Sequence, residues 1–184
     1  MKYQEELGSQ NSRFIPCDVT DEEKMKMAYE EGNKVFGGIR TYVNCAGIIH
    51  YENILNEEGI HSSENFKRVI NVNVLGSFFS TKFAAWHMKN LELIGNERGV
   101  IINTSSIFAE HAPTGFAAYG ASKGAIEGLL LPMARELGIY KIRLVNIAPG
   151  ITLTPMVEPF GKETIDGTKP LAIRGELGKP ENYA

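Results

Sequence analysis

The stretch Gly99-Val100-Ile101-Ile102-Asn103-Thr104 predicts a short β-strand, because a compact apolar run follows a glycine and makes both faces of the segment hydrophobic. Comparable strands are predicted at 39–44 and 142–147, and a shorter one at 14–17. Strands that are apolar on both faces are typical of parallel sheets covered by helices. The chain is therefore expected to build such a sheet.

Amphipathic stretches alternate with these strands. Helices are predicted at 21–36, 66–87 and 116–137. The first is expected to be capped by Thr20 or Asp21 and to end at Gly37, and the third to end at Gly138. The segment that follows the strand at 39–44 is expected to form a loop through Gly59. The alternation of strand and helix indicates the α/β class.

Composition excludes several classes of function. With 184 residues, 43% hydrophobic and 22% charged, the chain is most simply one globular domain. A net charge of −3 argues against nucleic-acid binding through a broad basic surface. No apolar run approaches the roughly 20 residues that a membrane span needs. The two cysteines and four histidines show no metal-ligand spacing, so no metal site is expected and the thiols are predicted to be reduced and buried.

Tyr119 and Lys123 are the most informative side chains for function. Their spacing of four residues within a predicted helix places them on one face. A cation beside a phenol favours the phenolate and lowers its pKa, so that the tyrosine can transfer a proton near neutral pH. Ser106, thirteen residues before Tyr119, can supply a second hydroxyl. The alternative interpretation is a solvated helix pair and a serine that only ends a strand.

Polar or turn-forming residues recur where the predicted strands end. Asp18, Asn44, Ser106 and Pro149 all occupy such positions. In parallel α/β sheets, ligands bind beyond the carboxyl ends of the strands. We therefore expect a ligand site at this edge of the sheet.

Five motifs in order resemble the short-chain dehydrogenase/reductase family: Asp18-Val19, Asn44-Cys45-Ala46-Gly47, Asn71-Val72-Asn73-Val74, Ser106 with Tyr119, and Pro149-Gly150 followed by Thr154. The segments 98–105, 131–135 and 147–150 are similar to the subgroup that oxidises 3-hydroxyacyl-CoA and hydroxysteroids. The resemblance implies a Rossmann-like, doubly wound parallel sheet with helices on both faces.

The resemblance also implies catalytic roles. Tyr119 would be the general acid/base, and Lys123 would depress its pKa and bind the nicotinamide ribose. Ser106 would bind the substrate oxygen, and Asn73 would hold a water that links Lys123 to solvent. Asn73 is also open to the simpler interpretation of a residue at a local helix bend.

For the cofactor, taken to be NAD, the resemblance implies further contacts. Asp18 and Val19 would meet the adenine, although Asp18 could instead only initiate a helix. The backbone around Cys45 would pass the adenosine ribose, while the Cys45 side chain is expected to be a small buried hydrophobe. Thr152 and Thr154 would lie near the nicotinamide carboxamide, and Tyr119 and Lys123 near its ribose.

Relative to the family pattern, the glycine-rich phosphate-binding turn and the final strand are not found in this sequence. Residues 1–184 are therefore expected to form a single, incomplete dinucleotide-binding dehydrogenase domain, truncated at both ends. The first hypothesis is an NAD-dependent oxidoreductase of acyl-CoA or steroid alcohols in fatty acid metabolism. The second is a non-catalytic scaffold or interaction subunit. The resemblance further implies a homotetramer and a mitochondrial location, with the cytoplasm as the alternative, and no nucleic-acid or membrane partner.

Overall fold

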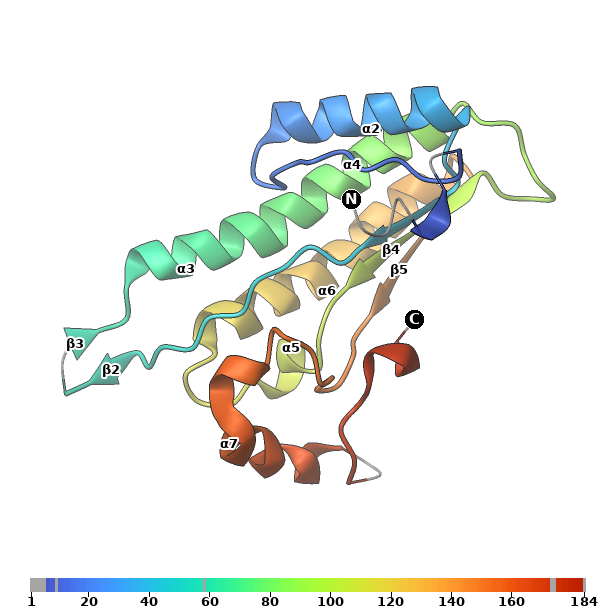
Figure 1. Cartoon of the computed structure of the whole chain (residues 1–184). Coiled ribbons are helices and arrows are strands. Elements are labelled where there is room, and N and C mark those ends of the chain that lie inside the picture. The colour runs from blue at the N-terminus through green and yellow to red at the C-terminus, as the bar shows by residue number, and fades with distance from the viewer. Residues whose placement is uncertain (1–5, 9, 58, 173–174, 184) are drawn as a thin grey trace.

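The computed structural model describes residues 6–8, 10–57, 59–172 and 175–183. A parallel three-stranded sheet forms its centre, in the order β1-β4-β5 (Figure 1). The strands are β1 (Thr41–Asn44), β4 (Gly99–Thr104) and β5 (Ile142–Ile147). Thr41 pairs with Val100, and Gly99 pairs with Ile142, so that all three strands end at the same edge. The predictions for β4 and β5 are confirmed, and β1 is two residues shorter than predicted.

Helices pack along the sheet. The main ones are α2 (Glu22–Phe36), α3 (Ser63–Ile70), α4 (Gly76–Met88) and α6 (Ala117–Gly138). Asp21 caps α2 by accepting the Lys24 N–H, and Gly37 ends it in the left-handed conformation, as predicted. The expected helix at 116–137 corresponds to α6 within one residue. The predicted α/β class with a parallel sheet is confirmed.

The predicted helix at 66–87 is longer and is interrupted. Ser62 starts it by accepting the Asn65 N–H, and a π-helical turn, η1 (Asn71–Leu75), separates α3 from α4. The wide turn is closed by a hydrogen bond from the Gly76 N–H to the Asn71 carbonyl. π-Turns inside helices frequently mark functional sites. Asn73 lies in the middle of this one.

Two local predictions were wrong. Residues 14–17 form no strand, because none of the described strands pairs with them, and Pro16 has no N–H to donate. The expected loop through Gly59 contains a small hairpin, β2 (Leu55–Asn56) and β3 (Gly59–Ile60). Asn56 stabilises its turn by accepting the Gly59 N–H through the side-chain oxygen.

Short helices surround the edge where the strands end. They are α5 (Phe108–His111), η2 (Glu158–Phe160), α7 (Gly161–Gly167), η3 (Lys169–Leu171) and η4 (Pro180–Asn182). In Figure 1 the segment from η2 to η4 lies in front of this edge and below the sheet. None of the described helices is both long and apolar enough to cross a bilayer.

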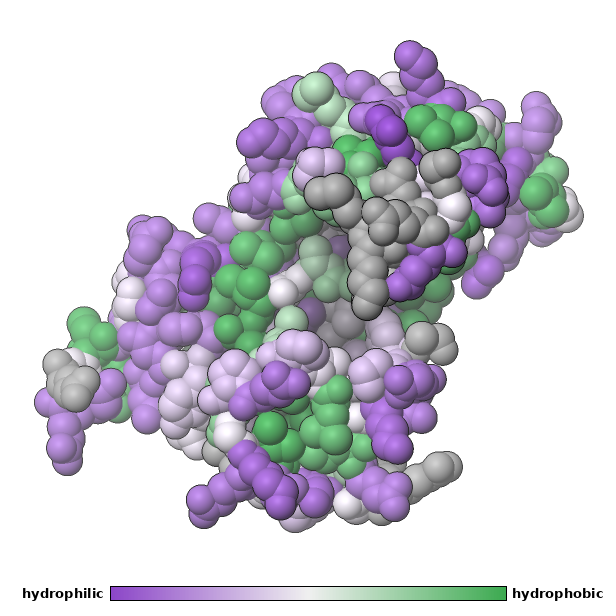
Figure 2. Space-filling view, viewed as in Figure 1, coloured by the Kyte–Doolittle hydropathy of each residue, from purple (hydrophilic) through white to green (hydrophobic). Residues whose placement is uncertain are grey.

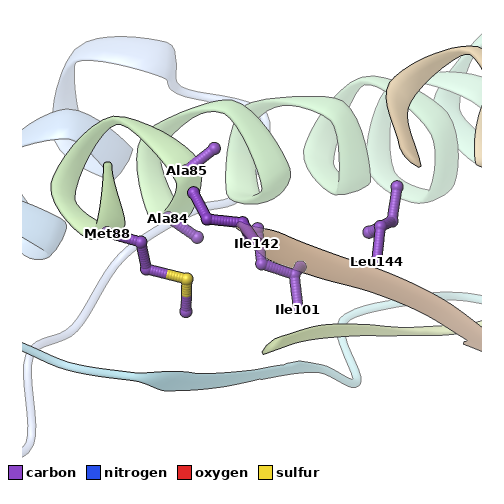
Figure 3. Packing of buried hydrophobic residues seen from close by; sticks show 6 residues of the cluster. All are labelled: Ala84, Ala85, Met88, Ile101, Ile142 and Leu144. Atoms are coloured by element: carbon purple, nitrogen blue, oxygen red, sulfur yellow. The ribbon is translucent and has the colours of Figure 1, made fainter. Parts of the chain in front are cut away.

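The core lies between the sheet and helices α4 and α6. Its buried members are Ala84, Ala85, Met88, Ile101, Ile142 and Leu144 (Figure 3). Alternation along β5 buries Ile142 and Leu144 and turns Val145 and Ile147 to the opposite face, where both are more than a third exposed. Tyr29 of α2 stacks on Tyr42 of β1 with ring centroids 4.9 Å apart, which extends the core toward the edge strand.

The face of the sheet opposite this core is apolar as well. Val43, Val145 and Ile147 point to it and remain partly exposed in the described part of the chain. Figure 2 shows apolar side chains on the surface in this view, beside the strands and again around α7. The strands are thus hydrophobic on both faces, as predicted, and the described helices α2, α4 and α6 cover one of them.

Replacing Met88 with alanine should lower the free energy of unfolding by about 2–5 kcal/mol, because a fully buried side chain would leave a cavity beneath β4. Met27, on the solvent side of α2, is 65% exposed, and Met27→Ala should change stability by less than about 0.5 kcal/mol. Chemical denaturation followed by circular dichroism measures both. Equal effects of the two changes would contradict the assigned core.

Candidate active site

Asn44, Ser106 and Pro149, which were predicted to end strands, lie at one edge of the sheet, whereas Asp18 follows no described strand. The Asn44 to Gly47 segment follows β1, Ser105 and Ser106 follow β4, and Pro149 and Gly150 follow β5. The backbone N–H of Ser105 donates to the Ile147 carbonyl at 2.8 Å, and that of Ile107 to the Pro149 carbonyl at 3.1 Å. This edge is where parallel α/β sheets bind ligands.

Helix α6 places Tyr119 and Lys123 against that edge, one turn apart. Lys123 is buried, and its ammonium donates to the carbonyl oxygen of Thr104 at 2.7 Å. The same ammonium lies 5.6 Å from the centroid of the Tyr119 ring. The two side chains therefore face the same region, as their spacing predicted, and the interpretation as a solvated pair does not hold.

The predicted effect of Lys123 on Tyr119 is wrong for this structure. Burial raises the pKa of Tyr119 above its ordinary value, and a hydrogen bond with the Ser106 side chain lowers it by a smaller amount. Burial also lowers the pKa of Lys123 to about 8, against a smaller opposing effect of Cys45. Loss of hydration is the larger cause, and the Lys123 ammonium donates its hydrogen bond to Thr104 and not to the phenol.

Ser106 has the predicted role at the end of a strand, and its role toward a substrate stays a prediction. Its oxygen accepts the Phe108 N–H at 3.1 Å, which starts the turn into α5. The Ser106 side chain also lies close enough to the Tyr119 phenol to lower its pKa. Because its oxygen already accepts one N–H, the hydroxyl proton is available for the phenol or for a substrate oxygen. The neighbouring Ser105 is buried, and its hydroxyl donates to the Lys123 carbonyl at 3.4 Å. Ser105 is therefore not the serine that acts on the Tyr119 phenol.

Asn73 is fully buried and joins three segments. Its amide nitrogen donates to the Ile48 carbonyl at 2.9 Å and to the Ser122 hydroxyl at 2.9 Å, while its oxygen accepts the Ile48 N–H at 2.8 Å. Ser122 immediately precedes Lys123. Asn73 thus links the π-turn to the loop after β1 and to α6. The interpretation of Asn73 as a residue at a local helix bend is confirmed by the π-turn, and its role in the site stays a prediction.

The loop after β1 passes close to Lys123. A Cβ atom on Gly47 would lie 3.5 Å from Oδ1 of Asn73 and 3.8 Å from Nζ of Lys123. Cys45 is exposed, and its sulfur lies 4.0 Å from the Thr104 hydroxyl. The prediction that Cys45 is buried was wrong, because it lies at the open end of the edge strand β1 and not beneath a covering element.

Two of the residues predicted to contact a cofactor have structural roles. Asp18 accepts the Thr20 N–H at 2.9 Å and the Thr20 hydroxyl at 2.8 Å, which is the helix-initiating interpretation and lowers the Asp18 pKa. Val19 packs on Gly76 at the start of α4, where a Cβ would lie 2.9 Å from a Val19 methyl group. Whether either residue also contacts adenine stays a prediction.

Thr152, which was also predicted to contact the cofactor, lies beyond β5. It forms an isolated bridge with Gly178, and its hydroxyl donates to the Gly150 carbonyl at 3.4 Å. Thr154 donates in turn to the Thr152 carbonyl at 3.5 Å. Both threonines line the cavity described next. They are close to Ser106 and Tyr119 in space, although a cofactor contact stays a prediction.

A cavity of about 330 Å³ opens beside the pair of hydroxyls. Ser106, Tyr119 and Thr152 line it together with apolar and aromatic side chains from α5, α6 and the segment 151–168. None of its lining residues, as far as the structure describes them, carries an ionisable acid, a basic side chain or histidine. A site of this kind favours an uncharged, largely apolar ligand whose oxygen reaches Tyr119 and Ser106.

Sequence reasoning missed the aromatic side chains of this cavity. Phe108 lies 5.9 Å from Tyr119 and 5.3 Å from Phe116, which in turn lies 5.3 Å from Tyr51 and 5.6 Å from Phe160, all between ring centroids. These residues belong to loops and helix starts, where neither helical nor strand periodicity marks them. The available signal was the occurrence of large aromatic residues in otherwise polar loops.

Residues 1–164 match the family model described as short chain dehydrogenase. Over 177 residues the chain is 40% identical to 3-hydroxyacyl-CoA dehydrogenase type-2 of Mus musculus, covering 93% of this chain and 67% of that protein. It is 37% identical to (3R)-3-hydroxyacyl-CoA dehydrogenase of Homo sapiens, over 95% of this chain and 64% of the relative. The chain thus spans about two thirds of the length of these relatives.

Solved structures give the same result. 3-Hydroxyacyl-CoA dehydrogenase type-2 from Mycobacterium avium superposes with a TM-score of 0.83 at 26% identity, covering 98% of this chain and 72% of that one. ElxO with NADP bound gives a TM-score of 0.81 at 28% identity, over 97% of this chain and 73% of ElxO. The chain belongs to the short-chain dehydrogenase/reductase family, a family of oxidoreductases. These comparisons do not support the alternative of an idle scaffold.

Replacing Asn73 with alanine should destabilise the fold by at least about 1–3 kcal/mol, because the buried N–H and carbonyl of Ile48 would lose their partners. The exposed Asn90, in the turn after α4, serves as a control, and Asn90→Ala should have little effect. Thermal melting of the two variants tests this. A stable Asn73→Ala protein would contradict the bridging role.

Proposed function

We propose that the chain is a single dinucleotide-binding dehydrogenase domain that transfers a hydride between NAD(H) and a secondary alcohol or ketone. We further propose that the substrate is a 3-hydroxyacyl-CoA, with a hydroxysteroid as the second candidate. The observation that carries the proposal is the Tyr119–Ser106 hydroxyl pair, which opens into an uncharged cavity. The similarity to relatives named 3-hydroxyacyl-CoA dehydrogenases supports the acyl-CoA assignment.

The cofactor site fits the residues at the edge of the sheet. The Lys123 ammonium has three N–H donors, of which one goes to Thr104, so it can also donate to the hydroxyl groups of a ribose. Lys123, Tyr119, Thr152 and the backbone at Cys45 would hold the nicotinamide half. When bound, the nicotinamide supplies an acceptor for the hydride that leaves the carbinol carbon of the alcohol. Support for NAD rather than NADP comes from the subgroup resemblance, while the similar protein ElxO has NADP bound in its structure.

In the oxidation direction, the chain's own residues handle the proton. As the C–H bond breaks with its electron pair, the phenolic oxygen of Tyr119 takes the proton of the alcohol O–H bond, and a C=O double bond forms. Ser106 donates a hydrogen bond to the substrate oxygen and orients it. In reduction, the protonated Tyr119 returns the proton to the same oxygen. Lys123 and Asn73 keep α6 and the neighbouring loop in place during both.

The uncharged lining of the cavity limits the substrate class. A free carboxylate placed there would lose its hydration with no cation to pair with. A thioester or a ring ketone brings no such charge beside the reacting carbon. The proposed substrate is therefore an acyl thioester whose acyl part is uncharged, or a steroid alcohol, and not a free hydroxy acid.

Two wider expectations stay predictions that rest on resemblance alone. The first is a homotetramer, and the second is a mitochondrial location, with the cytoplasm as its alternative. In support of an assembly, α4 presents Trp86, which is 62% exposed, and the partly exposed Phe78. The role in fatty acid metabolism depends on the acyl-CoA assignment.

Tyr119→Phe should lower kcat for acetoacetyl-CoA reduction by about 10²–10⁴-fold, because the proton donor is removed while the ring stays in place. Tyr140→Phe, at the exposed turn before β5, should leave the rate unchanged. Since the Tyr119 pKa is raised, wild-type oxidation should increase with alkaline pH as the phenolate forms, and reduction should fall. Full activity of Tyr119→Phe would exclude this mechanism.

The chain should reduce acetoacetyl-CoA and leave free acetoacetate essentially unreacted, with kcat/KM ratios of at least about 10² between them. Steady-state assays with NADH measure the ratio, and the same assays with NADPH test the coenzyme assignment. Preference for acetoacetate would contradict the charge argument. Faster reduction with NADPH would overturn the choice of NAD and leave the reaction class intact.

A further inference from the structure

Tyr51 is half-exposed and forms part of the wall of the cavity beside Tyr119. It lies in the loop after β1, contributes to the lining of the cavity, and makes an edge-to-face contact with Phe116 at 5.3 Å between ring centroids. Its ring also covers the backbone of Gly115, where a Cβ atom would lie 2.6 Å from Cδ2 of Tyr51. Gly115 has φ +84°, so both the space and the backbone conformation require glycine there.

A second hollow lies on the other side of this contact. It has a volume of about 640 Å³, is more open, and is lined by residues 52–55 and 112–115 together with Ala117. Pro113 and Thr114 line both hollows. Tyr51 lines only the inner one and Gly115 only the outer one. The Tyr51–Gly115 contact is therefore the partition between the cavity that holds Tyr119 and the outer hollow.

The partition is held in place by its neighbour Glu52. The Glu52 N–H donates to the Gly115 carbonyl at 2.8 Å, so the two loops are joined directly beside the ring. The Glu52 carboxylate accepts the Ser62 N–H at 2.8 Å, lies 2.9 Å from Nε2 of His50, and accepts the Asn65 amide at 3.1 Å. These bonds lower the Glu52 pKa to about 2 and attach the loop to the start of α3. These hydrogen bonds therefore restrict the position of the loop that carries Tyr51.

We propose that Tyr51 is a specificity-determining residue that limits the length of the acyl chain accepted by this site. The inference rests on the proposed function. The carbonyl oxygen of the substrate would lie at Tyr119 and Ser106, and the acyl chain would follow Phe108 and Phe116 toward Tyr51. A short acyl chain would end before the Tyr51 ring. A longer acyl chain would collide with that ring. Without the ring, the chain could continue into the outer hollow.

The test measures binding as well as turnover, using 3-ketoacyl thioesters of N-acetylcysteamine with four and ten carbons. For the full chain, calorimetry should give a ten-carbon Kd no lower than the four-carbon Kd. Tyr51→Ala should bind the ten-carbon thioester about 10-fold more tightly than wild type, with less than about 3-fold change for four carbons. Tyr51→Phe keeps the ring and should retain the wild-type preference, as should the control Tyr140→Ala. Gly115→Ala, which pushes the ring aside, should move the preference in the same direction as Tyr51→Ala.

The outcomes separate the two proposals. Turnover by wild type with no change of chain-length preference in Tyr51→Ala overturns the role of Tyr51 and leaves the proposed function in place. The expected change in binding with no turnover of either thioester supports the partition and contradicts the proposed reaction. A wild-type protein that binds the ten-carbon thioester about 10-fold more tightly than the four-carbon one also overturns the inference, because the chain would already pass Tyr51.

Discussion

A hydrogen bond from the buried ammonium of Lys123 to the carbonyl oxygen of Thr104 joins helix α6 to the end of strand β4. A buried charge is tolerated in a protein only when it has partners, and here the partner is the last residue of the central strand. The bond fixes the rotation of α6 about its axis. Tyr119, one turn earlier on the same face, is thereby directed to the end of β4, where Ser106 lies. The geometry of the hydroxyl pair follows from this one contact.

The environment that positions these groups also sets their acidity. Burial lowers the Lys123 pKa to about 8 and raises that of Tyr119, so it moves the two pKa values apart. A phenol with a raised pKa is a better proton acceptor once ionised and is fully protonated at neutral pH. In this state the chain is therefore prepared to give a proton to a ketone rather than to take one from an alcohol.

Much of the fold could be predicted because it depends on local patterns. The apolar runs of β4 and β5, the Asp21 cap and the glycine ends of the helices are all determined by neighbouring residues. The strand predicted at 14–17 failed because strand formation requires a partner, which a single segment does not reveal. The site residues could be listed from their spacing. Their acidity could not, since burial depends on side chains such as Phe108 and Phe116 that pack from elsewhere in the sequence.

The π-turn at Asn71–Leu75 has a consequence for how this helix tolerates change in length. Each residue in an α-helix turns the chain by about 100°. The wide turn absorbs one extra residue, so that Val69 on one side of it and Met88 on the other can both be buried. Deleting one residue of the π-turn would therefore leave a continuous α-helix whose two halves keep their orientation. Inserting a residue elsewhere in the helix would instead rotate one half relative to the other by about 100°.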